Sequence, residues 1–202
     1  MPLLFVKDVA PNVKLGVWSI KENVDEFFSG NACLEAMKDE ISLLKSYQRR
    51  CEVLAVRLLL NKMLGYDVVL SHNSDGKPIL NNGMNVGVSH TKGCAAVILS
   101  PCNNVSVDVE YLNDRVERIA GKFLRPDEKA GTLLEKLLHW CAKETLYKIY
   151  SADHLALADM RVLSVEGDNA NGFVVIKNVQ RGETLNVDYR VFDNLVLTYA
   201  VL

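Results

Sequence analysis

The chain has 202 residues, of which 49% are hydrophobic and 24% charged, as in an ordinary soluble globular protein. A formal net charge of −2 at pH 7 excludes a globally basic surface for nucleic acid or for an anionic membrane. No apolar run approaches the roughly 20 residues of a membrane helix, and the LLFV near the start is too short for a signal sequence, so we expect a cytoplasmic protein.

The first half predicts strands, two helices and then a turn-rich β region. A short helix should follow Asn23, and a long one should end at Gly65. Beyond that glycine we expect a short strand at 67–70 and a hairpin turn at Asn81-Asn82-Gly83. The expected strands are residues 3–9, 13–20, 84–89 and 94–99, and the long helix is 46–64.

The second half predicts a strand, helices and then a run of strands. Pro126 is expected to start a helix. The expected strands are residues 105–110, 160–166, 172–179, 183–189 and 194–201, with helices at 113–124 and 133–150. We therefore expect an α+β fold with halves 1–101 and 102–202. A faint repeat at an offset of about 90 residues suggests that these similar α/β halves form a monomeric pseudo-dimer with the active site between them.

The five cysteines are irregularly spaced and none forms a CxxC pair, so reduced thiols are expected. The scattered histidines show no zinc-ligand spacing.

The helix at 133–150 places Trp140, Glu144 and Lys148 on one stripe, four residues apart. Such a stripe is most often a solvated face with a weak ion pair. Upstream, Asp108 and Glu110 leave the same face of a strand, while Val107 and Val109 point to the other. Two adjacent carboxylates repel, and Mg²⁺ would remove that conflict, although most DxE patterns simply face solvent.

Several phosphate-compatible donors lie elsewhere in the chain. Arg50 and Arg57 share a helix face, which is either a solvated basic edge or an anion-binding edge. Lys77 precedes Pro78 in a GKP segment, and Ser89-His90 ends a strand.

Taken together, SVDVE, FLRPDE and WCAKETLYK resemble the signature of 4′-phosphopantetheinyl transferases, and GKP, VSHT and Arg57 resemble motifs of the family's first half. The resemblance covers roughly residues 49–148, and the length resembles that of the surfactin-synthetase-activating (Sfp-like) class. Ser106 stands where the family usually has Gly.

The resemblance implies a magnesium-dependent transferase (Mn²⁺ is an alternative metal). It would move the 4′-phosphopantetheine group of coenzyme A to a serine of an apo acyl or peptidyl carrier protein and release adenosine 3′,5′-bisphosphate. Such carrier proteins serve fatty-acid, polyketide or nonribosomal peptide synthesis.

The resemblance also implies roles for individual residues. Asp108, Glu110 and Glu144 would hold the metal, Glu144 would help remove the serine proton, and Lys148 would neutralise phosphate charge. Glu128 matches an acidic family position of open role, and Trp140 and Lys143 would fix the helix. The residues implied for coenzyme A are Arg50, Arg57, Lys77, Pro78, Ser89, His90, Asp108 and Lys148.

Two alternatives stay open. One is a non-catalytic coenzyme A or nucleotide binder of the same fold. The other is an unrelated magnesium-dependent phosphohydrolase, which would release phosphate without an acceptor protein.

Overall fold

A computed structural model describes residues 2–202, and the chain forms two compact units. The first unit runs to Asn73 and resumes at Pro78–Asn103, and the second holds Ser74–Lys77 and Asn104–Leu202. The chain passes from the first unit to the second after Asn103. The fold is mixed α/β, with three sheets and five α-helices among the described residues. Within residues 2–202, no helix is both long and apolar enough to cross a membrane.

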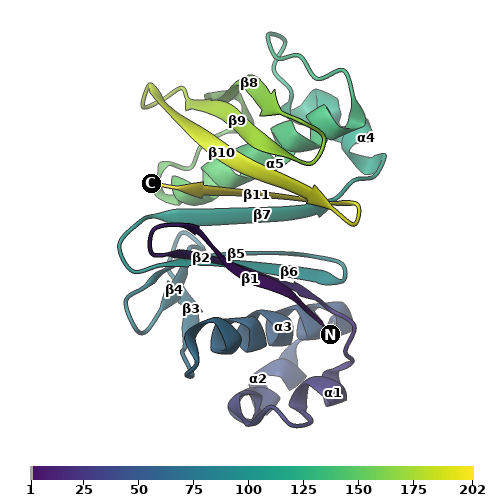
Figure 1. The fold of residues 1–202 in the computed structure, drawn as a ribbon, viewed down its shortest axis with the longest axis vertical. Helices are drawn as coiled ribbons and strands as arrows, with labels where there is room; N and C mark the ends of the chain where they lie inside the picture. The colour runs from purple at the N-terminus through teal and green to yellow at the C-terminus, as the bar shows by residue number, and fades with distance from the viewer. Residues whose placement is uncertain (1) are drawn as a thin grey trace. The chain divides into compact units, whose positions relative to one another are not determined.

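The first unit is a four-stranded antiparallel sheet with helices on one side (Figure 1). Its strand order is β1-β2-β6-β5, and a separate hairpin pairs β3 with β4. The strands are β1 (Leu3–Ala10), β2 (Val13–Ser19), β3 (Leu70–His72), β4 (Pro78–Leu80), β5 (Asn85–Thr91) and β6 (Cys94–Ser100). The helices are α1 (Val24–Phe28), α2 (Lys38–Leu43) and α3 (Tyr47–Leu64), with a 3₁₀ turn at Ala32–Met37.

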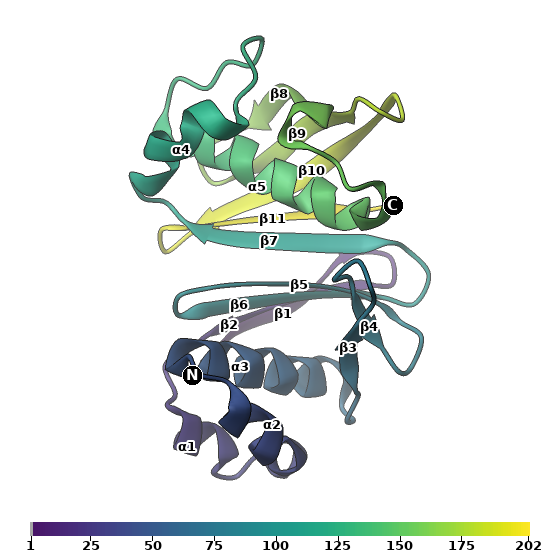
Figure 2. The same cartoon turned by 180° about the vertical axis from the view of Figure 1, so that it is seen from behind.

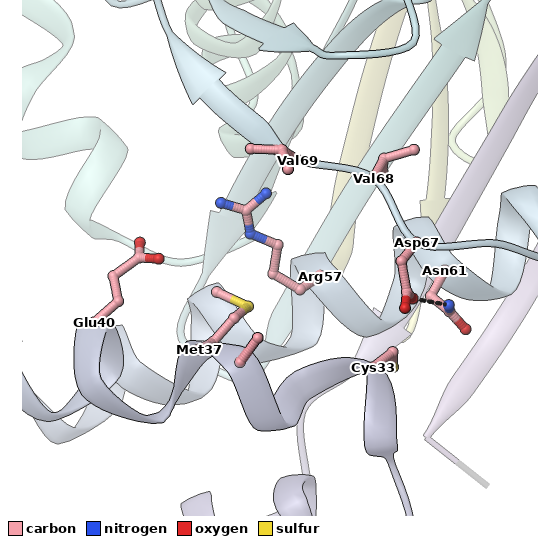
Figure 3. A pocket seen from close by; sticks show the side chains of 9 residues that line it. Cys33, Met37, Glu40, Arg57, Asn61, Asp67, Val68 and Val69 are labelled. Carbon is pink, nitrogen blue, oxygen red and sulfur yellow. Dashed lines mark hydrogen bonds between the residues drawn. The ribbon is translucent and has the colours of Figure 1, made fainter.

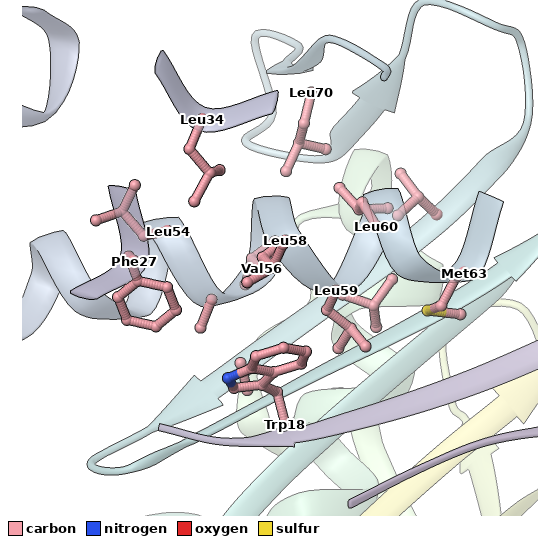
Figure 4. Close-up of a cluster of buried hydrophobic side chains, with 14 of the residues drawn as sticks. Trp18, Phe27, Leu34, Leu54, Val56, Leu58, Leu59, Leu60, Met63 and Leu70 are labelled. Atoms are coloured by element: carbon pink, nitrogen blue, oxygen red, sulfur yellow. The ribbon is translucent and has the colours of Figure 1, made fainter. Parts of the chain in front are cut away.

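Helix α3 begins and ends where its sequence supplies caps. The Ser46 side chain accepts a hydrogen bond from the Arg49 backbone N–H, and Gly65 takes the left-handed conformation, with φ of 80°. The helix packs so closely on β2 that a Cβ added at Gly16 would lie 2.7 Å from the Met63 sulfur. Figure 4 shows Trp18 of β2 beneath the leucines of α3, in the apolar core of this unit.

The second unit is a five-stranded antiparallel sheet of order β7-β11-β10-β9-β8, and α5 lies across one face of it (Figure 2). The strands are β7 (Val105–Tyr111), β8 (Met160–Gly167), β9 (Asn171–Asn178), β10 (Glu183–Phe192) and β11 (Leu195–Val201). The helices are α4 (Arg115–Phe123) and α5 (Leu133–Ile149). Both residues of the β10–β11 turn, Asp193 and Asn194, have positive φ, as a two-residue hairpin loop requires.

Three local expectations were wrong. The strand expected at 67–70 begins only at Leu70. Asn81-Asn82-Gly83 joins β4 to β5, which do not pair; the hairpin here is β3–β4. Pro126 starts no helix, because α5 is started by a capping box in which Thr132 and Glu135 bond to each other's backbone N–H.

The two units share one topological feature. In each, the strand that precedes the helices pairs antiparallel with the last strand of that unit: β2 with β6, and β7 with β11. This agrees with the internal repeat expected from the sequence. The arrangement of the units as a pseudo-dimer stays a prediction.

A fully buried ion pair ties the segment between α4 and α5 into the second unit. Lys143 Nζ lies 2.7 Å from Glu128 Oε2 and donates to the Phe123 carbonyl at 2.6 Å, and both charged side chains are 0% exposed. Glu128 also accepts from the backbone N–H groups of Arg125 and Val162. Lys143 and Glu128 therefore hold α5, β8 and this segment together, which is a structural role.

We predict that Lys143→Met lowers the free energy of unfolding by about 3–5 kcal/mol, because it leaves the Glu128 charge buried without its partner. Urea unfolding followed by circular dichroism measures the change. Lys136→Met is the matched control on the same helix, since Lys136 pairs with the half-exposed Glu117 and should cost no more than about 1 kcal/mol. Equal losses in the two variants would contradict the structural importance of the buried pair.

Candidate active site

The polar residues of β7 face α5. Ser106, Asp108 and Glu110 alternate with valines along the strand. The Ser106 hydroxyl donates to the Thr145 carbonyl of α5 at 2.8 Å, which fixes the side of the sheet on which these residues lie. Asp108 is only 5% exposed, so this carboxylate lies at the helix–strand contact and not on an open face.

Small hydroxyl side chains bring α5 close to the sheet. Thr198 of β11 is opposite Asp108 in the ladder, and its hydroxyl lies 2.7 Å from that of Thr145. The same Thr198 hydroxyl donates to the Cys141 carbonyl at 3.2 Å. These buried polar groups satisfy one another, so they set the position of the helix without an unpaired donor.

Lys148 is paired with Asp108. Its Nζ lies 2.7 Å from Asp108 Oδ1 and also donates to the Val107 carbonyl at 3.0 Å. The Lys148 side chain is 29% exposed, whereas that of Asp108 is 8% exposed. The ammonium group is therefore held at the carboxylate while part of the lysine remains open to solvent.

Glu144 lies one helical turn before Lys148 and is half-buried. Burial raises the pKa of Glu144, the negative charge of Asp108 raises it further, and Lys148 lowers it. The structure thus brings Glu144, Asp108 and Lys148 into one electrostatic group.

Glu110 and Asp108 both lie close enough to Cys141 for their charges to act on its thiol. Burial raises the pKa of the Cys141 thiol well above its usual value, and the charges of Asp108 and Glu110 raise it further. The Cys141 thiol is therefore neutral and serves as a packing residue between the two carboxylates.

The donor atoms of these residues suit a divalent metal, but they are not arranged as a preformed metal site. Asp108, Glu110 and Glu144 offer the carboxylate oxygens that Mg²⁺ and Mn²⁺ prefer. Yet no three His, Cys, Asp or Glu side chains within residues 2–202 converge into a metal-binding group. Because these carboxylates do not converge, a bound Mg²⁺ would take its remaining ligands from solvent or substrate. Lys148 already supplies one positive charge to Asp108.

Two arginines of the first unit bond to backbone carbonyls. Arg50 Nε donates to the Leu44 carbonyl at 2.6 Å, and Arg50 Nη2 donates to the Ser42 carbonyl at 3.1 Å. Arg57 Nη2 donates to the Leu70 carbonyl at 2.6 Å, and its buried Nε has no hydrogen-bond partner among residues 2–202.

Arg57 lines a cavity of about 290 Å³ beside α3 (Figure 3). Burial lowers the pKa of Arg57, and the charge of Glu40 opposes that shift. The other lining residues are Cys33, Ala36, Met37, Asn61, Asp67, Val68 and Val69.

The GKP segment is divided between the units. Lys77 belongs to the second unit, and its Nζ lies 2.8 Å from Asn104 Oδ1. Asn104 in turn donates to the Ile149 carbonyl at the end of α5. Pro78 begins β4 in the first unit and is half-buried.

Ser89 and His90 lie on β5, where Ser89 is 7% exposed. His90 Nδ1 lies 3.0 Å from Glu52 Oε2, and His90 Nε2 contacts Arg49 Nη1. Sequence reasoning selected Arg50 and Arg57 on α3 and missed Arg49 and Glu52. The available signal was Glu52 itself, a lone acid in an otherwise apolar stretch of the helix, three residues after Arg49.

Comparison with known proteins bears on the second unit. Residues 104–200 match the family model of the 4′-phosphopantetheinyl transferase superfamily. The matched span contains Asp108, Glu110, Glu144 and Lys148, together with the two elements that carry them. It supports phosphopantetheine transfer in general, with coenzyme A and a carrier protein as the partners that this superfamily implies. No curated protein matches the chain.

Proposed function

We propose that this chain transfers the 4′-phosphopantetheine group of coenzyme A to a serine of an apo acyl or peptidyl carrier protein. The supporting observation is the group formed by Asp108, Glu144 and Lys148 at the contact of α5 with β7. It lies within the span that matches the transferase superfamily. The serine oxygen would attack the β-phosphorus of coenzyme A, and adenosine 3′,5′-bisphosphate would leave.

Lys148 and Glu144 have complementary parts in this proposal. Lys148 neutralises negative charge that moves onto the pyrophosphate as the bond to the leaving phosphate breaks. Glu144 accepts the serine proton, directly or through water, and its raised pKa makes it a better proton acceptor than an exposed carboxylate. Positioning and charge neutralisation account for most of the rate in reactions of this type.

Asp108, Glu110 and Glu144 are the residues proposed to hold Mg²⁺, or Mn²⁺ in its place. The bound cation would neutralise charge on the pyrophosphate oxygens. Lys148 keeps Asp108 paired before the substrate arrives, so the carboxylate is held in position by an existing bond.

The residues proposed for coenzyme A keep the roles that the resemblance implies. They are Arg50, Arg57, Lys77, Pro78, Ser89, His90, Asp108 and Lys148. We further propose a monomer of the Sfp-like class that acts in the cytoplasm.

The decisive experiment incubates the chain with coenzyme A, MgCl₂ and a panel of apo carrier proteins and measures their masses. A gain of one phosphopantetheine group on a carrier serine supports the proposal and identifies the acceptor. No mass gain on any carrier, together with coenzyme A binding, would favour a non-catalytic binder. Release of inorganic phosphate without an acceptor would favour a phosphohydrolase.

We predict that Asp108→Ala or Glu144→Ala reduces transfer by about 10²–10³-fold, because each removes a carboxylate from the catalytic group. Transfer is measured as holo carrier protein formed per minute at limiting MgCl₂. Glu166→Ala, which removes an exposed carboxylate from β8, should change transfer less than twofold (about 0.4 kcal/mol). Near-normal transfer by either site variant would count against the assignment.

We predict different kinetic losses for the two ends of coenzyme A. Arg57→Ala and Lys77→Ala should raise KM about tenfold with little change in kcat, since they contact a phosphate that does not react. Lys148→Ala should lower kcat instead. With 3′-dephospho-coenzyme A, the Arg57 and Lys77 losses should shrink while the Lys148 loss persists. Steady-state kinetics with both donors makes the comparison, and equal Arg57 and Lys77 losses with both donors would refute the 3′-phosphate assignment.

A further inference from the structure

Asn104, the residue just before β7, connects three segments of the second unit. Its backbone N–H donates to the Leu202 carbonyl at 2.9 Å, and the Leu202 N–H donates to the Asn104 carbonyl at 2.8 Å. Two residues that exchange both of their backbone bonds form the tight pair of an antiparallel ladder. The backbone of Asn104 is therefore fixed beside the end of β11, and its side chain extends from a defined position.

The Asn104 side chain joins α5 to the GKP segment. Its Nδ2 donates to the Ile149 carbonyl at 3.3 Å, and its Oδ1 accepts from Lys77 Nζ at 2.8 Å. A backbone carbonyl only accepts and a lysine ammonium only donates, so both contacts require the same orientation of the amide. The opposite orientation would place two N–H donors against the ammonium and leave the carbonyl facing an oxygen.

The bond to Ile149 also places Lys77 at a favourable end of α5. Ile149 is the last residue of that helix, where carbonyl groups have no partner within the helix. Asn104 satisfies one of these carbonyls and holds the ammonium beside them. The C-terminal end of a helix carries partial negative charge, so a cation is stabilised there.

Lys77 and Lys148 are held by acceptors of different charge. Lys148 lies 2.7 Å from the Asp108 carboxylate, which neutralises much of its charge. Asn104 Oδ1 is a neutral amide oxygen, so it orients Lys77 without removing the positive charge. An ammonium group has three N–H bonds, so the bond to Asn104 is compatible with another to a phosphate oxygen.

The turn that carries Lys77 has a second, weaker contact within the second unit. Asp75 Oδ1 lies 4.0 Å from His154 Nε2, and the His154 side chain is 72% exposed. An exposed pair at that distance contributes little, because solvent screens it. The bond from Lys77 to Asn104 is therefore the stronger of these two contacts.

We propose that Asn104 is a positioning residue for Lys77, which it holds at the end of α5 with its charge available to a phosphate group. The proposal rests on the proposed function, in which Lys77 contacts coenzyme A. A lysine side chain loses much rotamer freedom when it is ordered, and Asn104 imposes that order before the ligand binds. Asn104 thus raises the affinity for coenzyme A without touching it.

The first test is Asn104→Ala, which removes both side-chain bonds. We expect KM for coenzyme A to rise about fivefold with kcat within twofold, since the contact it prepares is the same in the ground and transition states. With 3′-dephospho-coenzyme A, the loss should shrink together with that of Lys77→Ala. Asn186→Ala, on the exposed surface of β10, is the matched control and should leave KM within twofold.

A double-mutant cycle separates positioning from a general effect on the fold. In the Lys77→Ala background, Asn104→Ala should change KM less than twofold, because no ammonium remains to be positioned. A residue that only stabilised the unit would produce the same loss with or without Lys77. Additive losses in the double variant, or an unchanged KM in Asn104→Ala, would overturn the proposal.

Asn104→Asp tests whether the acceptor must be neutral. It keeps the length of the side chain and an oxygen for Lys77, but it adds a negative charge, and it serves as the second variant if Asn104→Ala does not fold. We expect KM for coenzyme A to rise at least as much as in Asn104→Ala, since the carboxylate neutralises the ammonium. Wild-type affinity in this variant would contradict the proposal. Circular dichroism checks the folding of each variant.

Direct binding distinguishes this proposal from the proposed function. Calorimetry with coenzyme A and no carrier protein measures Kd for the same four proteins of the cycle. If the losses are non-additive but no carrier protein is modified, the role of Asn104 stands and the transferase proposal fails. If transfer is observed but the losses add, the transferase proposal stands and the role of Asn104 is refuted. A wild-type chain that binds no coenzyme A would refute both.

Discussion

The contact between α5 and β7 is the constraint on which the candidate active site depends. Ser106, Thr145 and Thr198 have short side chains whose hydroxyls bond across this contact, so the helix approaches the sheet closely. Lys148 then reaches Asp108 from the helix, and Glu144 lies near enough for the charge of Asp108 to raise its pKa. A bulkier side chain at these positions would separate the helix from the strand and move Glu144 and Lys148 away from Asp108.

Burial distinguishes the roles of three ion pairs in this chain. Lys143 and Glu128 are closed off from solvent and hydrogen-bonded to backbone groups, so they cannot contact a ligand and have a structural role. Lys148 pairs with a buried carboxylate but is itself partly exposed, and so can meet a substrate. Glu52 is buried behind the more exposed side chains of Arg49 and His90. In a pair that is not sealed from solvent, the more exposed side chain is the one that a ligand can contact.

Prediction from sequence succeeded where the interaction is local. Asn23 and Ser46 cap helix starts through their side chains, Gly65 ends a helix in the left-handed conformation, and the last four strands lie close to their expected ranges. It failed at residues 67–70 and at Asn81-Asn82-Gly83, because strand pairing there depends on which segment lies alongside. It also overlooked Glu52, since a single acid in an apolar helix reveals its partners only when β5 is placed beside it.

By itself, the sequence determined the helix limits, the strand alternation that sets Asp108 and Glu110 on one face, and the stripe that aligns Glu144 with Lys148. These follow from the fixed periods of strand and helix. Only the tertiary structure decided that Lys148 pairs with Asp108, that Lys143 closes on Glu128, and that Arg49 rather than Arg50 meets His90. Those outcomes depend on contacts between segments far apart in the chain, and packing of whole elements, not local periodicity, selects them.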